Sequence, residues 1–246
     1  MKYQYYNEIL DNLTNVFENE EEAIDEAIDL LTNGILNKNS IFIFGASHAG
    51  ILTQEMFYRA GGLILINPIF ANETLVNNSP ISMTSDMETL EGYGKVVCKH
   101  IPFKKDDILI LHSVSGRNNI TIDLAIEAKK IGVKLIGITN LEYSKSVKSR
   151  HESGKNLYEL VDIVIDNHGE IGDACCKIEG IEQKVGPSST VVGATILNTI
   201  VVEVCKKLSK KGLKELPIFY SANLDGGSEL NNKLIKEYKD SIHYEF

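Results

Sequence analysis

Two different spacings of apolar residues divide the chain. Up to residue 38 the apolar positions recur every three or four residues, as they do on the buried face of a helix. From Ser40 onward, short apolar runs alternate with segments of helical spacing. The pattern predicts two amphipathic helices over 1–38, followed by an α/β region. The acidic run Glu18–Glu22 falls at the junction of the two helices and is expected to be a solvated helix start.

The apolar runs of the α/β region are strand candidates, and they lie at 41–44, 63–66, 108–111, 133–138 and 163–165. Helices are expected between and after these runs, at about 50–60, 86–99, 119–131, 142–148 and 189–210. Strands that are apolar throughout and alternate with helices form parallel sheets that are covered on both faces. We therefore predict one domain over 1–246, a three-layer α/β/α sandwich with a five-stranded parallel sheet. Its core is 40–211, and 212–246 is a loop with a last helix at about 228–242.

Composition and charge exclude several classes of function. The 246 residues carry a net charge of −9 at pH 7, which argues against nucleic acids and anionic membrane surfaces as partners. No apolar run reaches the roughly 18–20 residues of a membrane span, and the first residues do not resemble a signal peptide. Four cysteines without a C-x-x-C pair indicate a reduced, cytoplasmic protein. Since the neighbouring Cys175 and Cys176 rarely face one ion together, no metal and no cofactor are expected.

Three loops rich in hydroxyl groups follow strands or open helices. The first is G-A-S-H-A-G at 45–50, the second is S-V-S-G-R-N at 113–118, and the third is V-G-P-S-S-T at 185–190. Such turns present free backbone N–H groups and the positive end of the helix dipole, which together bind anions. Helix capping explains any one of these loops by itself. Three of them on one sheet predict a pocket for a sugar phosphate.

The pocket has a defined set of expected contacts. The phosphate and sugar contacts are expected to be Ser47, Ser113, Ser115, Gly116, Arg117, Asn118, Ser188, Ser189 and Thr190. Arg117 is expected to contribute a charge-assisted hydrogen bond, because a guanidinium beside a phosphate loop suits that anion.

The order and content of the three loops resemble the sugar isomerase (SIS) domain family of phosphosugar isomerases and phosphosugar-binding regulators. The second loop is similar to the family's S-x-S-G-x-[ST] phosphate loop, with Asn118 where Ser or Thr is usual. The first loop departs from the family pattern, because Ala49 stands at the expected serine unless Ser47 substitutes for it. The motifs F-Y-R-A-G-G, S-G-R-N, V-G-P-S-S-T and S-A-N-L-D-G-G resemble those of an uncharacterised bacterial subgroup.

The resemblance covers about 41–211 and implies a flavodoxin-like sheet with helical extensions at both ends. It also implies a homodimer or tetramer whose active sites are completed across the interface. The apolar N-terminal helices offer a surface for that assembly.

Aldose–ketose isomerisation needs a base that moves a proton between adjacent carbons and an acid that opens the ring. Similar isomerases use a glutamate and a histidine or lysine. Glu55, on the helix after the first loop, and His48, within that loop, are the first candidates here. Glu91 and Glu179 are the others. Pairing with Arg59 one helical turn later explains Glu55 equally well.

Other interpretations of the same residues stay open. The fold can sense a phosphosugar without turning it over, or eliminate from a sugar-phosphate ether with the same carboxylate base. Gly45–Ala49 nearly spells the nucleophile elbow of a serine hydrolase, followed by Asp225 and His243, but only helices precede the first strand. A dinucleotide site is disfavoured because the G-x-G-x-x-G spacing is missing and Asn67-Pro68, not an acid, ends the second strand. The leading hypothesis is a phosphosugar-binding protein that acts as an isomerase.

Overall fold

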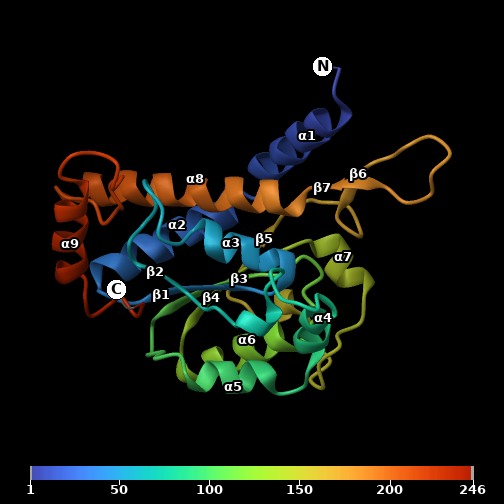
Figure 1. Ribbon diagram of the computed structural model, residues 1–246, viewed down its shortest axis with the longest axis horizontal. Coiled ribbons are helices and arrows are strands. Elements are labelled where there is room, and N and C mark those ends of the chain that lie inside the picture. The colour runs from blue at the N-terminus through green and yellow to red at the C-terminus, as the bar shows by residue number, and fades with distance from the viewer. Residues whose placement is uncertain (1, 245–246) are drawn as a thin grey trace.

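The sheet determines where a ligand can bind. The computed structural model describes residues 2–244 and contains a five-stranded, all-parallel sheet (Figure 1). Its strands are β1 (Ile41–Gly45), β2 (Ile66–Pro68), β3 (Ile108–His112), β4 (Lys134–Thr139) and β5 (Ile163–Asp166). They lie in the order β2-β1-β3-β4-β5, so the direction of winding reverses between β1 and β3. Parallel sheets bind ligands at such a switch point, beyond the carboxyl ends of the strands.

Helices cover both faces of the sheet. They are α1 (Gln4–Asn19), α2 (Glu21–Leu36), α3 (Gly50–Glu55), α4 (Ser82–Thr89), α5 (Tyr93–Lys99), α6 (Asn119–Ile131), α7 (Leu141–Ser146), α8 (Ser189–Lys210) and α9 (Gly227–Glu237), with 3-10 turns η1 (Ser47–Ala49), η2 (Asn72–Thr74) and η3 (Leu157–Glu159). Ile41 and Ile43 pack under α2, α3 and α8, whereas Phe42 and Phe44 pack against α5 and α6. This alternation buries every residue of β1 and confirms the predicted three-layer sandwich.

Several predicted boundaries differ from the structure, and the last helix, expected at about 228–242, ends at Glu237. The helix expected at 86–99 is two helices, α4 and α5, because Gly92 between them has a positive φ of 77°. The strand expected at 63–66 joins the sheet only at Ile66, because Leu63 and Ile64 pair with 217–218 instead. The helix expected to reach residue 60 ends at Glu55.

A projecting antiparallel hairpin is absent from the prediction. It consists of β6 (Ala174–Cys176) and β7 (Val185–Pro187), and its three-residue strands are too short for a readable alternation. The hairpin extends from the body beside α1, and Tyr5 Oη donates a hydrogen bond to the Pro187 carbonyl at 2.8 Å (Figure 1). We call α1 together with residues 169–187 the arm.

The acidic junction between the first two helices is partly structural. Glu20 separates α1 from α2, and its carboxylate accepts the Asp166 N–H at 3.2 Å and pairs with His168 Nε2 at 2.8 Å. These contacts attach the N-terminal helices to the end of β5. The predicted solvated helix start is therefore wrong for Glu20, although its neighbours at 18, 21 and 22 are exposed.

The sequence predicts neither a membrane span nor a metal site, and the described residues can be searched for both. Within 2–244, none of the helices has the length and apolar character needed to cross a membrane. The same residues include no group of three histidine, cysteine or acidic side chains placed to hold a metal. Cys175 and Cys176 are buried free thiols whose sulfurs lie 3.9 Å apart.

Candidate functional site

The loop at 113–118 leaves β3 at the switch point, and we call it the phosphate loop. Its carbonyls face the protein: Asn140 N–H and Thr139 Oγ1 donate to the Val114 carbonyl at 3.0 and 3.1 Å, and Leu157 N–H donates to the Gly116 carbonyl at 2.8 Å. By contrast, the backbone N–H groups of 114–121 find no acceptor among the described residues. A run of free N–H groups at the start of a helix has the geometry that suits an anion.

Gly116 explains why the loop needs a glycine. Its φ is +61°, a left-handed value that L side chains rarely adopt. A Cβ atom at this position would lie 2.8 Å from Ser144 Oγ and 3.2 Å from Thr139 Oγ1. The close approach of the loop to β4 and α7 therefore depends on the missing side chain.

Asn118 connects the phosphate loop to two residues that the sequence analysis missed. It occupies the N-cap position of α6 but makes no capping bond with its side chain. Instead Asn118 Nδ2 donates to Glu88 Oε2 on α4 at 2.7 Å, and Arg150 Nη1 donates to Asn118 Oδ1 at 2.8 Å. Both polar atoms of the Asn118 side chain are therefore hydrogen-bonded within the protein, and its contact with a ligand stays a prediction.

Glu88 has the electrostatic character of an acid–base group. Burial raises the pKa of its carboxyl from 4.5 to about 7, against the opposing effects of the Arg150 charge and the Asn118 hydrogen bond. A carboxyl that titrates near neutrality can both take up and return a proton. The hydrogen bond from Asn118 attaches this group to the phosphate loop.

Arg117 lies within the phosphate loop, and its contact with a ligand stays a prediction. Its Nε atom is buried and has no hydrogen-bond partner among the described residues. The chain has only three arginines, and Arg59 is paired with Glu55. Of the other two, Arg117 lies in the phosphate loop and Arg150 is hydrogen-bonded to it.

The first loop lies next to the phosphate loop. His112, the last residue of β3, is buried, and its Nδ1 lies 3.3 Å from the Ala49 carbonyl in η1. The backbone N–H groups of 46–49 have no acceptor among the described residues. Ser47 and the exposed His48 therefore adjoin the candidate site, and their roles stay predictions.

The predicted carboxylates are not gathered at the phosphate loop. Glu55 ends α3, where it pairs with Arg59 and lies 3.4 Å from Asn198 Nδ2, as the simpler explanation of its position anticipates. Glu91 is exposed in the turn after α4. Glu179 is exposed in the projecting hairpin (Figure 1). Burial and the hydrogen bond from Asn118 distinguish Glu88 from Glu91, and the sequence pattern reveals neither.

The third loop holds an anion that belongs to the protein itself. Asp173 Oδ1 accepts the Ser188 and Ser189 N–H groups at 3.2 and 2.8 Å, and Asp173 Oδ2 accepts Ser189 Oγ at 2.8 Å. The carboxylate therefore caps α8 where a ligand phosphate was expected. Thr190 follows and is half-buried, and a ligand role for this loop stays a prediction.

Loss of the Asp173 cap is expected to weaken the fold. Asp173→Ala leaves the first N–H groups of α8 without their acceptor and should lower the free energy of unfolding by about 1–2 kcal/mol. Urea unfolding followed by circular dichroism measures the change. Asp25→Ala, which removes an exposed carboxylate from α2, is the matched control. Equal stability of the two variants would show that Asp173 is not a structural cap.

The serine hydrolase interpretation is wrong. His243 Nε2 lies 2.8 Å from Ser40 Oγ, before the amino end of β1. Ser47 follows the carboxyl end of the same strand, about 20 Å away at about 3.3 Å per residue. The Ser47, Asp225 and His243 side chains therefore cannot form one triad.

Comparison with known proteins identifies relatives over the full length. The family model described as SIS domain matches residues 4–140. A UPF0309 protein of Shouchella clausii is 47% identical over 241 residues, and one of Oceanobacillus iheyensis is 48% identical, each match covering 98% of both chains.

Solved structures share the fold at low identity. A phosphoheptose isomerase from Neisseria gonorrhoeae has a TM-score of 0.53 and 13% identity, covering 83% of this chain and 95% of its own. One from Francisella tularensis has a TM-score of 0.54 and 13% identity, covering 81% and 94%. At this identity the similarity concerns the architecture.

Proposed function

We propose that this chain, which belongs to the SIS domain family, binds a phosphorylated sugar at the phosphate loop and interconverts its aldose and ketose forms. One observation carries the proposal. Glu88, a carboxyl group with a pKa raised to about 7, is hydrogen-bonded to a loop whose free N–H groups suit a phosphate. An isomerase of sugar phosphates needs this combination of a fixed anion and a nearby base.

The proposed reaction assigns a task to each group. The N–H groups of 114–121 and the Arg117 guanidinium hold the phosphate and so fix the sugar chain. Glu88 removes a proton from the carbon next to the carbonyl, which gives an enediolate. A proton then passes from the hydroxyl oxygen of that carbon to the former carbonyl oxygen, and Glu88 returns its own proton to the former carbonyl carbon. His48 stays our candidate for the acid that opens the ring.

A binding screen followed by isotope exchange tests this function. Melting temperatures are measured with pentose, hexose, heptose and amino-sugar phosphates, and each sugar that stabilises the protein is incubated in D₂O. Proton NMR should show deuterium at the carbon next to the carbonyl and a second sugar phosphate as product. Binding without exchange would favour a sensor, and loss of an ether substituent would favour a lyase.

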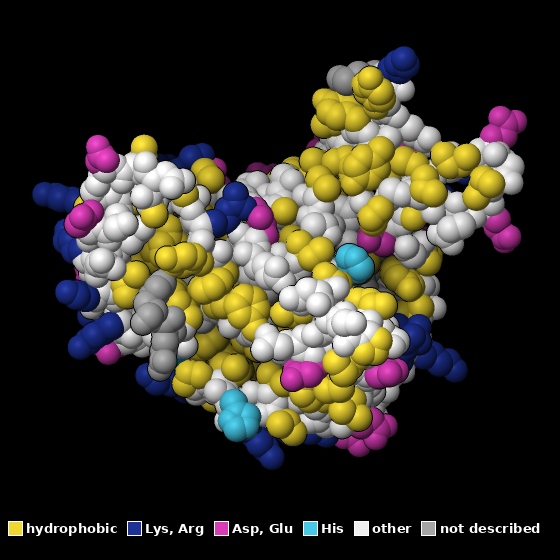
Figure 2. Space-filling view, viewed as in Figure 1, with side chains coloured by type: hydrophobic (Ala, Val, Ile, Leu, Met, Phe, Trp, Pro, Cys, Tyr) yellow, Lys and Arg dark blue, Asp and Glu magenta, His cyan; other side chains and the backbone are white. Residues whose placement is uncertain are grey.

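The proposal includes assembly with a second copy of the chain. Exposed apolar side chains are frequent on the arm, where Figure 2 shows several groups of hydrophobic side chains. They are Tyr5, Tyr6, Leu10, Ile171, Ile178, Ile181 and Val185, together with Tyr3 directly before α1. Monomeric proteins rarely expose large apolar patches, so a partner is expected to cover the apolar side chains of the arm.

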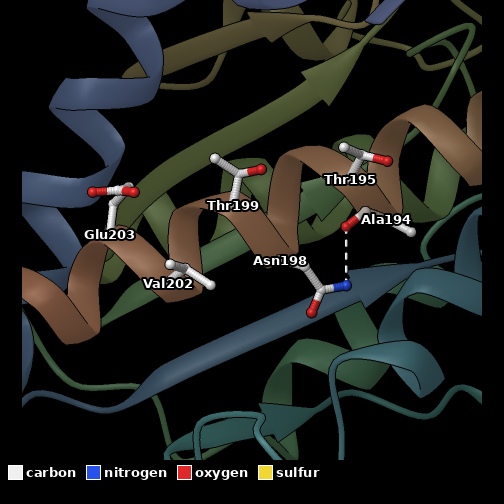
Figure 3. A pocket seen from close by; sticks show the side chains of 6 residues that line it. All are labelled: Ala194, Thr195, Asn198, Thr199, Val202 and Glu203. Carbon is white, nitrogen blue, oxygen red and sulfur yellow. Dashed lines mark hydrogen bonds between the residues drawn. The ribbon is translucent and has the colours of Figure 1, made fainter. Parts of the chain in front are cut away.

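The exposed side of α8 is the complementary surface. A hollow of about 570 Å³ runs along its middle, lined from one helix as Figure 3 shows, and a second of about 570 Å³ lies at its C-terminal half. A two-fold axis through the middle of this helix, about 33 Å long, places each arm against the partner's second hollow. The exposed Glu179 and Glu182 of the arm then approach Lys206 and Lys210, which line that hollow. Opposite charges support a second copy as the occupant.

A charge in this surface is expected to separate the copies. Val202→Glu places a carboxylate in both hollows and should convert a dimer into a monomer in light scattering after gel filtration. Val96→Glu is the matched control, because Val96 on α5 and Val202 are both 51% exposed. A monomeric unmodified protein, or an equally large effect of both variants, would contradict this interface.

A further inference from the structure

A segment without helix or strand fastens itself over the phosphate loop. It comprises residues 147–156, between α7 and η3, and we call it the strap. The Arg150 N–H donates to the Arg117 carbonyl at 3.0 Å, and the Leu157 N–H directly after the strap donates to the Gly116 carbonyl at 2.8 Å. The strap is therefore attached to the loop by backbone bonds at two points.

Arg150 is the cation of the strap that contacts the phosphate loop. Its Nη1 donates to Asn118 Oδ1 at 2.8 Å, and its charge acts on the Glu88 carboxyl. Among the described residues, no carboxylate forms a close ion pair with Arg150. A guanidinium has five N–H donors in a planar fork that matches phosphate. Most of these donors remain open beside a loop that is itself an anion site.

A buried hydrogen bond to a carboxylate holds the residue next to Arg150. His151 is 8% exposed, and its Nε2 lies 3.1 Å from Oδ1 of Asp123, which is fully buried in α6. The Ser153 N–H donates to His151 Nδ1 at 3.0 Å, so Nε2 carries the hydrogen and donates to Asp123. The other charged groups here are Lys95, 3.8 Å from Asp123 Oδ1, and Glu152, which Lys95 also contacts at 2.8 Å.

The location of this pair points to positioning rather than to general stability. Burying a carboxylate is costly, and apolar side chains of similar volume stabilise a core at least as well. What a buried hydrogen bond between fixed partners adds is a defined orientation. Here the orientation is that of the backbone at 151, one residue from the guanidinium that faces the phosphate loop.

We propose that Arg150 is a second cationic contact for the ligand's phosphate, and that Asp123 and His151 are positioning residues that set it over the phosphate loop. The proposal rests on the proposed function only in that an anion binds this loop. It requires no isomerisation. The Asp123–His151 pair affects phosphate binding through Arg150 and not through the stability of the whole fold.

Inorganic phosphate is the probe, and its affinity is measured by calorimetry on the full chain. Arg150→Ala should weaken binding about 10- to 100-fold, the value of a charge-assisted hydrogen bond. Lys148→Ala removes an exposed cation from the same strap and should change affinity less than twofold. Equal affinity of Arg150→Ala and the unmodified protein would overturn the proposal, as would the absence of phosphate binding by the unmodified protein.

A double-mutant cycle separates positioning from stability. His151→Leu should weaken phosphate binding about 5- to 20-fold in the unmodified background but not in the Arg150→Ala background. His151→Gln, whose amide keeps a donor near the Nε2 position, should restore most of the affinity. If His151→Leu does not fold, His151→Asn serves, because its amide is too short to reach Asp123. An equal loss in both backgrounds would overturn the positioning role. Phosphate binding that follows this pattern without any sugar turnover would remove the proposed isomerisation and leave this inference standing.

Discussion

Glu88→Gln is expected to lower the turnover of a sugar phosphate about 10²- to 10⁴-fold while the enzyme still binds the ligand. This is the usual contribution of a positioned general base, and the amide cannot take up the proton. In the unmodified protein, turnover should rise with pH up to about 7, where the Glu88 carboxyl ionises, and should then level off. The variant should lack this rise. Rates measured between pH 5 and 9 by NMR test both expectations.

Two further variants make the assignment of the base specific. Asp86→Asn removes an exposed carboxylate from the same helix and should leave turnover nearly unchanged. Glu91→Gln removes the carboxylate that the sequence nominates three positions later. A large loss from Glu91→Gln together with a small loss from Glu88→Gln would contradict the assignment of Glu88.

The same substitution should stabilise the fold at alkaline pH. The folded pKa of Glu88, about 7, is above its unfolded value of 4.5, so the unfolded chain loses the proton first as the pH rises. The stability contributed by the protonated form is complete below about pH 4.5 and is lost as the pH rises to about 7. Glu88→Gln should therefore raise the free energy of unfolding above pH 7 by up to about 3 kcal/mol and change it little at pH 4.5. Melting temperatures at the two pH values measure this difference, and a gain in stability at pH 8 would exclude misfolding as the cause of lost activity.

The sheet could be predicted because its evidence is local. Every residue of β1 and β3 is apolar or nearly so, and such strands are stable only when both faces are covered. The phosphate loop could be predicted for the same reason, because a strand, hydroxyl groups, a glycine and a helix follow one another directly in the sequence. The structure adds the reason for the glycine, since Gly116 has a positive φ and no room for a Cβ atom.

Glu88 and Arg150 escaped prediction because their roles depend on distant contacts. Each meets Asn118 across 30 or 32 positions of sequence, and neither lies in a motif. Burial then gives Glu88 its raised pKa, and burial depends on how α4 packs against α6. The spacing of Glu88 along a helix shows neither its burial nor its contact with Asn118. Sequence grounds therefore favoured Glu55 first, with Glu91 among the other candidates.

Asp173 shows a different limit of the sequence. The hydroxyl-rich start of α8 predicts an anion, and the structure contains one, but it is a side chain of the same protein. Backbone N–H groups do not distinguish a carboxylate of the chain from a phosphate of a ligand. The phosphate loop differs because no acidic residue reaches its N–H groups among the residues described. Of the two helix starts, the one at α6 is therefore the stronger ligand site.

Ser115→Glu should abolish phosphate binding, with affinity at least 100-fold weaker in calorimetry, because the new carboxylate repels the phosphate and fills the free N–H groups. The fold should not suffer, since Asp173 already stabilises the start of α8 in the same manner, and the melting temperature is expected to stay equal or to rise by a few degrees. Ser228→Glu, at the exposed first turn of α9, is the matched control and should bind phosphate normally. Unchanged phosphate affinity in Ser115→Glu would show that the anion site is elsewhere, whereas a collapse of the melting temperature would show that Ser115 is a packing residue.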